Sequence, residues 1–488
     1  MDTICTVVAP DEQSWGCTIK LSPIDQIAPR DYNVLHLFFR LGDDFSNRDL
    51  FRQLETAVLK TARDIPQLAC GVRKCANSRE ELELAYSANF GAHVVFRDLV
   101  PIWPHGNFDS LAKEHFPMPK LERRFLLNID YTQEVLPGLV IQANFIEGGL
   151  ILTTALHHTI CDGTGVSMFH QALARHLRGS TMSDPWPCLE PTINERVGIV
   201  SPSTGVHLEE FPHWKRTSGM ESFLDPVSFD GEATPVRYSI YSISETKSQE
   251  LRDRLVQEGG VKVSISDAIS AFIWVHVLRA RNIDTDAYPN SKLSITVDAR
   301  SRMTDCHVPT GYWGNFSEPN AVACMCTKFM CGEVSEENTT GMDQSVSTCD
   351  SDEALDWSVK LPKAARRVKQ AIAAVDNSAV RRLVGLLHQM PKATSLTWNV
   401  NRWPGPDMLI VGVNRFPTNI MQYGPLGYSE ATRISIGNTE EKPDGRCILL
   451  PAQRGEGRGL EIALQYDFAT LDRLKESKQF AEYFTWRN

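Results

Sequence analysis

The sequence predicts an α/β or α+β fold built in two halves of about 200–250 residues each. Its 488 residues exceed the roughly 100–200 residues of an ordinary domain, which leaves room for two or three domains. Short β-patterned runs alternate irregularly with amphipathic helical patterns. The periodicity fades into Pro, Ser, Gly and mixed charge at residues 198–236. We therefore predict an N-terminal domain at 1–197, a crossover segment at 198–236 and a C-terminal domain at 237–488.

The first half contains clear strand and helix patterns. Residues 34–41 are typical of a strand, and apolar positions recur at helical spacing across residues 50–63. Two further β-rich runs occupy residues 139–145 and 150–156. The residues between them, Ile-Glu-Gly-Gly at 146–149, supply the glycines that a tight turn needs, so these two runs predict a β-hairpin.

The second half contains a helix, a strand and a terminal helix. Apolar residues fall on one face across residues 265–276, with Ser266 or Asp267 near the start of that helix. Residues 460–466 alternate between apolar and other side chains, which predicts a half-buried strand. Thr470 is then expected to cap a terminal helix that runs through Phe484.

The charge balance restricts the partners that the surface can attract. Fifty Lys and Arg residues against 60 Asp and Glu residues give a net charge of −10, which argues against nucleic acid or an anionic membrane as a partner. Seven of the acidic residues lie at 331–353, a stretch without basic residues that we expect to be an exposed insertion. A small anionic ligand needs only a local basic patch and remains possible.

Targeting and cysteine patterns favour a cytoplasmic protein. Residues 1–10 have no charged leader and too short an apolar stretch for a signal peptide. No run approaches the roughly 18 apolar residues of a membrane span. We expect the twelve cysteines to be reduced. The spacing of Cys306-His307, Cys324, Cys326 and Cys331 matches no common zinc site, so no metal is predicted.

The most informative local feature is His157-His158-Thr159-Ile160-Cys161-Asp162-Gly163, which lies between a predicted strand and a predicted helix. A histidine at the end of a strand is held rigidly and titrates near neutral pH, which suits a general base. Asp162 can influence the loop that aims the ring, and Gly163 allows a close approach or an unusual dihedral. The alternative is an ordinary polar turn, with His157 packed locally and Cys161 serving as a small buried hydrophobe.

Several segments in a fixed order resemble one family. The HHxxxDG pattern is similar to the active-site motif that BAHD acyltransferases share with the condensation domains of peptide synthetases. Fungal secondary-metabolite members, such as trichothecene acetyltransferases, are the most similar subgroup. The other matching segments are LSPIDQ at 21–26, AVLKTARDIPQLACGV at 57–72, VSISDAISAFIW at 263–274, VDARSR at 297–302, GYWGN at 311–315 and the helix at 471–483.

This resemblance implies a fold and a set of site residues. It implies two pseudo-symmetric domains of chloramphenicol-acetyltransferase type, each a mixed sheet flanked by helices, with a channel between them. His158 would be the general base, while Asp162 would point away from the substrate and pair with Arg300. Gly163 belongs to the same motif. Lys262 lies where the family's contacts to coenzyme A phosphates tend to cluster.

Two family motifs are altered in this sequence. The stretch Gln422-Tyr423-Gly424-Pro425-Leu426-Gly427 occupies the place of DFGWG, and its acidic position is Gln422. Val411-Gly412-Val413 stands where a Ser/Thr-Ser-Trp segment is usual, so no donor to the oxyanion is assigned. The first change leaves the chemistry intact but puts in doubt a local ion pair and the channel near it.

The resemblance implies an acyl-CoA-dependent O-acyltransferase, with acetyl as the expected acyl group and a hydroxyl of a hydrophobic secondary metabolite as the acceptor. Transfer would be direct in a ternary complex, without a tightly bound cofactor. We expect a monomer without nucleic-acid or membrane partners. The alternatives are a free-standing condensation-type enzyme that uses carrier-protein thioesters, an N-acyltransferase, or an inactive binding protein on the same fold.

Overall fold

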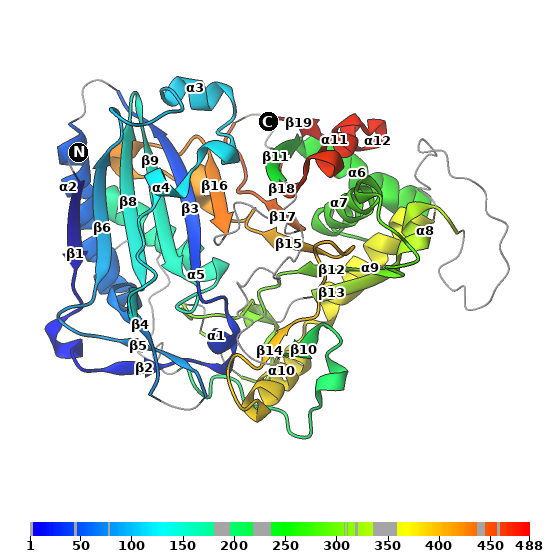
Figure 1. Ribbon diagram of the computed structural model, residues 1–488, viewed down its shortest axis with the longest axis horizontal. Coiled ribbons are helices and arrows are strands. Elements are labelled where there is room, and N and C mark those ends of the chain that lie inside the picture. The colour runs from blue at the N-terminus through cyan, green and yellow to red at the C-terminus, as the bar shows by residue number, and fades with distance from the viewer. Residues whose placement is uncertain are drawn as a thin grey trace.

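The computed structural model describes residues 3–42, 46–76, 79–179, 196–217, 236–306, 308–309, 311–317, 321–334, 359–436, 445–455 and 459–488. Two mixed sheets lie side by side, each accompanied by helices (Figure 1). This architecture confirms the predicted fold class.

The first sheet has the strand order β1-β6-β8-β9-β3-β16. It is mixed because β6 and β8 run parallel while the other neighbouring strands are antiparallel. Its strands are β1 (Thr3–Val8), β3 (Tyr32–Arg40), β6 (Ala92–Asp98), β8 (Leu139–Ile146), β9 (Gly149–His157) and β16 (Thr432–Ile436).

The hairpin predicted from the first half is confirmed. Strands β8 and β9 pair antiparallel, and Ile146 lies opposite Gly149 at the turn. Gly148 adopts a φ of 77°, which a glycine reaches without strain. Every residue of both strands is buried, because neighbouring strands and packed layers surround them. His157, the last residue of β9, pairs with Tyr32 at the start of β3.

Helices α2 (Asn47–Asp64) and α5 (Gly163–Leu177) pack on each other, and α2 contacts β1 and β6. The predicted helix at 50–63 is therefore confirmed. Both helices present one apolar face to the first core, which also receives side chains from the late part of the chain. The rigid sheet and α5 together determine where the HHxxxDG residues lie.

The second sheet has the strand order β13-β12-β15-β17-β18-β11-β19. Strand β15 runs parallel to β12 and β17, and the remaining pairs are antiparallel. Its strands are β11 (Val236–Ile243), β12 (Asn290–Ile295), β13 (Ala321–Cys326), β15 (Met408–Gly412), β17 (Arg446–Leu449), β18 (Leu460–Asp467) and β19 (Thr485–Trp486).

Helix α7 (Ile265–Arg281) is almost completely buried beside the second sheet. It contacts α6 (Glu245–Gly259), α8 (Thr327–Cys331), α9 (Lys360–Ala374) and α11 (Phe468–Glu476), so apolar side chains suit nearly its whole circumference. Ser264 caps it, and Asp267 reciprocates by accepting the Ser264 N–H at 2.9 Å. The residues predicted near its start, Ser266 and Asp267, lie in the first turn.

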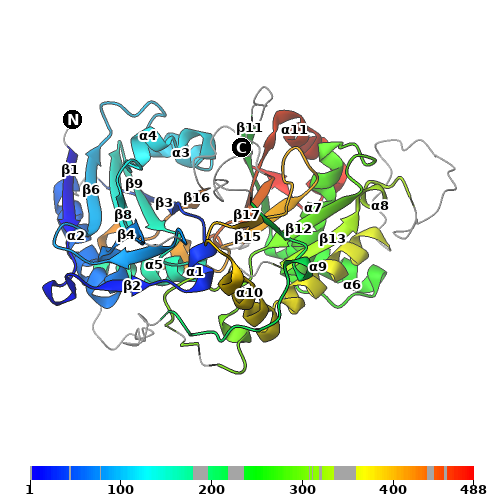
Figure 2. The same ribbon diagram turned by 60° about the horizontal axis from the view of Figure 1, so that its bottom comes forward.

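Shorter elements complete the described fold. A four-stranded sheet and a two-stranded sheet accompany the main sheets, and α1 lies between the main sheets beside α10 (Figure 2). The short strands are β2 (Thr18–Lys20), β4 (Gly71–Lys74), β5 (Leu82–Ala85), β7 (Val135–Pro137), β10 (Trp214–Arg216) and β14 (Leu396–Trp398). The other helices are α1 (Pro23–Ile27), α3 (Phe108–Lys113), α4 (Arg123–Leu126), α10 (Asn377–Gln389) and α12 (Lys478–Ala481).

The late part of the chain also completes the first sheet. Strand β16 pairs with β3, and Arg433 on β16 forms a buried ion pair of 2.9 Å with Glu461 on β18.

In the altered late motif, Tyr423 is fully buried, and its hydroxyl lies 3.3 Å from His170 Nδ1 of α5. Arg178 Nη1 donates to the Gln422 carbonyl oxygen at 2.8 Å. The altered motif therefore anchors this segment on α5.

Two sequence predictions near the C-terminus are wrong. Strand β18 is buried from Glu461 to Asp467 rather than half-buried, because Ile462 and Leu464 lie in the second core while Ala463 on the other face lies in the first. Glu461 is buried in its ion pair with Arg433. The terminal helix consists of α11 and α12, capped by Asp467 and Ser477. Thr470 is inside the first turn, where its hydroxyl donates to Asp467 Oδ2 at 2.6 Å.

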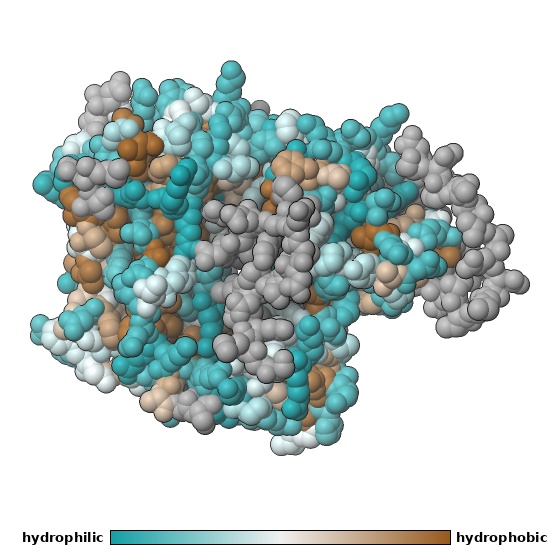
Figure 3. All heavy atoms as spheres, viewed as in Figure 1, coloured by the Kyte–Doolittle hydropathy of each residue, from teal (hydrophilic) through white to brown (hydrophobic). Residues whose placement is uncertain are grey.

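Hydrophilic side chains predominate on the face shown in Figure 3, with hydrophobic ones gathered in small areas. Among the described residues, no helix is long and apolar enough to cross a bilayer. Most of the acidic segment predicted as an insertion at 331–353, and residues 218–235 of the crossover segment, lie outside the described residues.

Candidate active site

The loop between β9 and α5 carries the HHxxxDG residues. Asp162 is the N-cap of α5, and its Oδ1 accepts the backbone N–H groups of Thr164 at 3.1 Å and Gly165 at 3.2 Å. These bonds satisfy two of the amide groups that a helix start leaves unpaired. The cap therefore determines where the helix begins and where the loop that carries His158 ends.

His158 is partly exposed at the end of the buried strand. Its backbone N–H donates to the Asp31 carbonyl oxygen at 2.7 Å, and its ring Nδ1 lies 3.2 Å from Asn315 Oδ1. Burial lowers the pKa of His158 below the ordinary 6.5, although its own backbone, Asp162 and Asn315 act in the opposite direction. The imidazole is therefore neutral at pH 7, which is the form that accepts a proton.

His157 has a different environment from its neighbour. It is 1% exposed, its Nδ1 accepts the Thr159 N–H at 3.3 Å, and its ring packs edge-on against Tyr32 with centroids 5.1 Å apart. Burial lowers the pKa of His157 to about 3. The prediction that His157 packs and bonds locally is confirmed, and of the two histidines only His158 has an exposed part.

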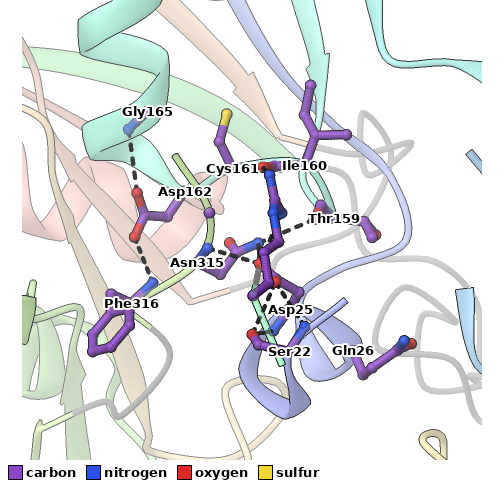
Figure 4. Close-up of polar contacts among 12 residues, drawn as sticks. Ser22, Asp25, Gln26, Thr159, Ile160, Cys161, Asp162, Gly165, Asn315 and Phe316 are labelled. Carbon is purple, nitrogen blue, oxygen red and sulfur yellow. Dashed lines mark hydrogen bonds and ion pairs between the residues drawn. The ribbon is translucent and has the colours of Figure 1, made fainter. Parts of the chain in front are cut away.

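The ion pair that the resemblance implies between Asp162 and Arg300 is present. Arg300 Nη1 lies 2.9 Å from Asp162 Oδ2, and Arg300 Nη2 lies 3.0 Å from Oδ1, which is a bidentate arrangement. Asp162 Oδ2 also accepts the Phe316 N–H and the Ser317 hydroxyl, each at 2.8 Å. Figure 4 shows the carboxylate turned toward Gly165 and Phe316. The pair connects a loop of the first sheet with the 3-10 helix at Arg300–Arg302 after β12.

This pair stays charged although it is buried. Burial by itself raises the pKa of Asp162, but the charge and hydrogen bonds of Arg300, with those of Phe316 and Ser317, hold it below 3.8. Burial likewise opposes the charge on Arg300, whereas Asp162 and Asp298 raise the pKa of its guanidinium. Arg300 also donates to the Gly314 carbonyl oxygen at 2.7 Å. All acceptor positions of Asp162 are therefore occupied by protein donors, which suits positioning and leaves no free carboxylate for substrate.

Two glycines at the start of α5 pack closely against neighbouring side chains. A Cβ on Gly163 would lie 3.1 Å from the Phe416 ring, so the close-approach interpretation of Gly163 holds. Its φ is not positive, so the unusual-dihedral alternative is wrong. A Cβ on Gly165 would lie 2.4 Å from the Cys161 Cβ. Burial raises the pKa of the Cys161 thiol well above its ordinary value, which makes this cysteine a packing residue rather than a nucleophile.

Lys262 lies apart from these residues. Its side chain is exposed on the segment before α7, and its carbonyl oxygen accepts a hydrogen bond from Lys369 Nζ of α9 at 2.6 Å. The ammonium group of Lys369 therefore reaches the backbone of Lys262, which brings two basic residues together at the surface, where phosphate groups are attracted. Within the described residues, no group of three or more His, Cys, Asp or Glu side chains could hold a metal ion.

Sequence reasoning missed a second set of polar residues behind the loop. Asn315 is fully buried, and its Nδ2 donates to Asp25 Oδ1 at 3.0 Å. Arg196, also fully buried, lies 3.4 Å from Asp25 Oδ1 and donates to the Ile160 carbonyl oxygen at 2.9 Å. Asp25 and Asn315 belong to the LSPIDQ and GYWGN segments, which already match the family in sequence. Nothing in the sequence, however, indicates that these two segments contact each other.

Comparisons with known proteins identify relatives that match nearly the whole chain. The model of the Transferase family matches residues 3–480. An acyltransferase of Cordyceps militaris, cm3D, is 26% identical over 514 residues, covering 99% of this chain and 100% of the relative. Eremophilane O-acetyltransferase ORF8 of Penicillium roqueforti is 25% identical, covering 96% of this chain and 98% of the relative.

A solved structure has the same fold. F. graminearum TRI101 complexed with coenzyme A and deoxynivalenol superimposes with a TM-score of 0.78 at 19% identity, and the alignment covers 97% of this chain and 100% of that chain. The similarity extends over both sheets.

Proposed function

The chain belongs to the Transferase family, the BAHD-type acyltransferases, and we propose that it transfers an acyl group from coenzyme A to a hydroxyl of a hydrophobic secondary metabolite. One observation carries the proposal. His158, a partly exposed residue with a neutral imidazole, stands at the end of β9, while Asp162 is buried in the pair with Arg300. The His158 imidazole is therefore free for proton transfer, while the Asp162 carboxylate holds the loop in place.

The reaction that suits this arrangement is direct transfer. His158 removes the proton of the acceptor hydroxyl, and the resulting alkoxide attacks the thioester carbonyl carbon. The tetrahedral intermediate then collapses, the carbon–sulfur bond breaks, and the coenzyme A sulfur takes the proton from His158. No acyl-enzyme is formed, in keeping with the buried, protonated thiol of Cys161.

We propose that Lys262, with Lys369 beside it, binds phosphates of coenzyme A. Both lie on the surface of the second half, where Lys369 Nζ reaches the Lys262 carbonyl oxygen at 2.6 Å. Coenzyme A is the ligand named for the TRI101 structure. Here it is a co-substrate, so no tightly bound cofactor is required.

An acetyl group and a terpenoid-like hydroxyl are the substrates that we propose. The P. roqueforti relative is named as an eremophilane O-acetyltransferase, and the TRI101 structure holds deoxynivalenol. No observation favours the condensation-type, N-acyltransferase or binding-protein alternatives. The expectations of a monomer, a cytoplasmic location, a channel between the domains and domain limits at 197 and 237 stay predictions.

Thiol release from a panel of acyl thioesters tests the proposed function. With an extract of hydroxylated fungal metabolites, we expect acetyl-CoA to release free coenzyme A and to yield acetyl esters detectable by mass spectrometry. A matched arm offers acetyl groups on a phosphopantetheinylated carrier protein. Turnover with the carrier alone would identify a condensation-type enzyme, and an amide product would identify an N-acyltransferase. Binding of metabolites without turnover of any thioester would identify a binding protein.

The pH dependence of turnover is a second prediction. Because the pKa of His158 is lowered, we expect log kcat/KM to rise with slope one at acidic pH, to bend below pH 6.5 and to stay level through neutrality. Released coenzyme A is followed with a thiol reagent whose response is calibrated at each pH. A midpoint above pH 6.5 would show that the base is another group or that its charged form is favoured in the free enzyme.

A further inference from the structure

The side-chain amide of Asn315 has one orientation that its neighbours permit. Its Nδ2 faces three acceptors, namely Asp25 Oδ1 at 3.0 Å, the His158 carbonyl oxygen at 2.9 Å and the Thr159 carbonyl oxygen at 3.4 Å. Turning the amide over would place Oδ1 against those three oxygens, which would be repulsive in a buried site. The oxygen of Asn315 therefore faces His158 Nδ1, at 3.2 Å.

An amide oxygen accepts hydrogen bonds and cannot donate one. A hydrogen bond between Asn315 Oδ1 and His158 Nδ1 therefore requires the proton to be on Nδ1. A neutral imidazole with its proton on Nδ1 has its lone pair on Nε2. Among the described residues, no hydrogen bond is made to Nε2. This is the nitrogen that remains available to an incoming hydroxyl.

Asn315 is itself held in place by a buried charge. Asp25 Oδ1 accepts both the backbone N–H of Asn315 at 2.8 Å and its Nδ2, while Asp25 Oδ2 accepts the Ser22 hydroxyl at 2.8 Å. Arg196 balances the Asp25 carboxylate, and both side chains are 0% exposed. Figure 4 shows dashed lines running from Asn315 toward Asp25 and Thr159, with Ser22 beside Asp25. Segments far apart in the sequence thus converge on one amide.

We propose that Asn315, oriented by Asp25 and Arg196, is a positioning residue that keeps His158 in the tautomer with its proton on Nδ1. The inference rests on the proposed function, because tautomer control matters for turnover only if His158 is the base. Asn315 Nδ2 also binds the His158 carbonyl oxygen, so this one side chain contacts both the ring and the backbone of His158.

The position of the proton can be measured without turnover. In the whole enzyme with ring-15N histidine, long-range 1H–15N spectra at pH 8 assign a protonated Nδ1 and an unprotonated Nε2 to His158, identified by the signals lost in His158→Ala. In Asn315→Leu, which has no acceptor at this position, we expect protonation of Nε2. We expect kcat to fall about 10²-fold with little change in KM, since a base in the wrong tautomer is present but inactive.

Two further variants separate positioning from folding. Asn315→Asp keeps an oxygen toward Nδ1, so we expect the proton to stay on Nδ1. Its second oxygen replaces the Nδ2 donor against Asp25 and two carbonyl oxygens, so we expect its melting temperature to fall at least as far as that of Asn315→Leu. Thr159→Val removes a buried hydroxyl that has no hydrogen-bond partner, so it perturbs the same loop and should leave the tautomer and kcat unchanged. A merely structural role for Asn315 would lower the melting temperature of Asn315→Leu without moving the proton.

The outcomes distinguish this inference from the proposed function. Retention of the proton on Nδ1 in Asn315→Leu would overturn the inference, because the tautomer would then not depend on Asn315. The inference would also be overturned if Asn315→Leu moves the proton but keeps the wild-type kcat, while His158→Ala is inactive. Full turnover by His158→Ala would instead overturn the proposed function, whatever the tautomer measured in the Asn315 variants.

Discussion

Replacing His158 with alanine is expected to lower kcat about 10²–10⁴-fold, because a positioned general base contributes that factor. The loss should appear in kcat rather than in KM, since the imidazole acts on the proton that moves in the transition state. The protein should keep its fold, because the His158 side chain is partly exposed and its backbone bond to Asp31 is unaffected. Coenzyme A release from acetyl-CoA with a metabolite extract, corrected for uncatalysed hydrolysis, measures the effect.

Two control variants make the His158 result specific. His388→Ala removes an exposed histidine on α10 and should leave kcat unchanged. Cys161→Ala should retain most turnover, because the thiol is buried and held protonated. Equal rates in His158→Ala and wild type would exclude His158 as the base. Inactivity of a folded Cys161→Ala, with trapping of an acyl-enzyme on the wild type, would replace direct transfer by a covalent route.

Removing one partner of the Asp162–Arg300 pair should have the largest effect on stability. Arg300→Leu leaves the Asp162 carboxylate buried at 1% exposure without its counter-ion, which typically costs about 3–5 kcal/mol. The hydrogen bonds from Thr164, Gly165, Phe316 and Ser317 remain, so we expect the lower end of that range. Because the pair holds the His158 loop, kcat per folded enzyme should also fall, by about tenfold. Denaturant unfolding and thiol release measure the two effects.

The sequence itself supplies a control for Arg300. Arg302 lies in the same 3-10 helix and donates to the carbonyl oxygens of Ile372 and Val375 on a neighbouring turn. Arg302→Leu should lose only about 1 kcal/mol of unfolding free energy and leave kcat unchanged. A comparable loss of kcat in the two variants would mean that the whole 3-10 helix, rather than the ion pair, positions the loop.

A double-mutant cycle then isolates the pair. Asp162→Asn places an amide against Arg300 and weakens the acceptor for Phe316 and Ser317, so it should be destabilising alone. When Arg300→Leu is added, the second loss should be smaller than in the wild-type background, because the interaction is already broken. The coupling is expected at about 2–3 kcal/mol, the upper part of the range for residues in one network. Additive effects within about 0.5 kcal/mol would show that the two side chains do not stabilise each other.

The features that the sequence predicts correctly depend on neighbours along the chain. The β8–β9 hairpin follows from two apolar runs and a glycine turn, and α2 and α7 follow from apolar spacing of one helical turn. The strand–loop–helix that carries His158 is likewise a local pattern. The error made for β18 also comes from a local pattern. Alternation of apolar and other side chains predicted a half-buried strand, but packing in the folded protein buries both of its faces.

The partners of the loop residues could not be predicted from periodicity. Asn315 lies 290 residues from Asp25 and 157 residues from His158, and Arg196 is separated from both by whole strands and helices. A polar residue within a loop gives no signal of which distant residue it will meet. The resemblance to a family made the pairing of Asp162 with Arg300 available, because it assigned a role to both positions.

The sequence by itself determined the fold class, the strand–loop–helix around His158 and the residue types that suit acyl transfer, since each depends on short-range order and side-chain chemistry. Tertiary structure alone decided that His158 stays partly exposed, and that Arg196 pairs with Asp25 behind the loop. It also decided that Asn315 turns its oxygen to Nδ1. The physical reason is that tautomers, pKa values and ion pairs depend on distances of a few ångströms between groups that only folding brings together.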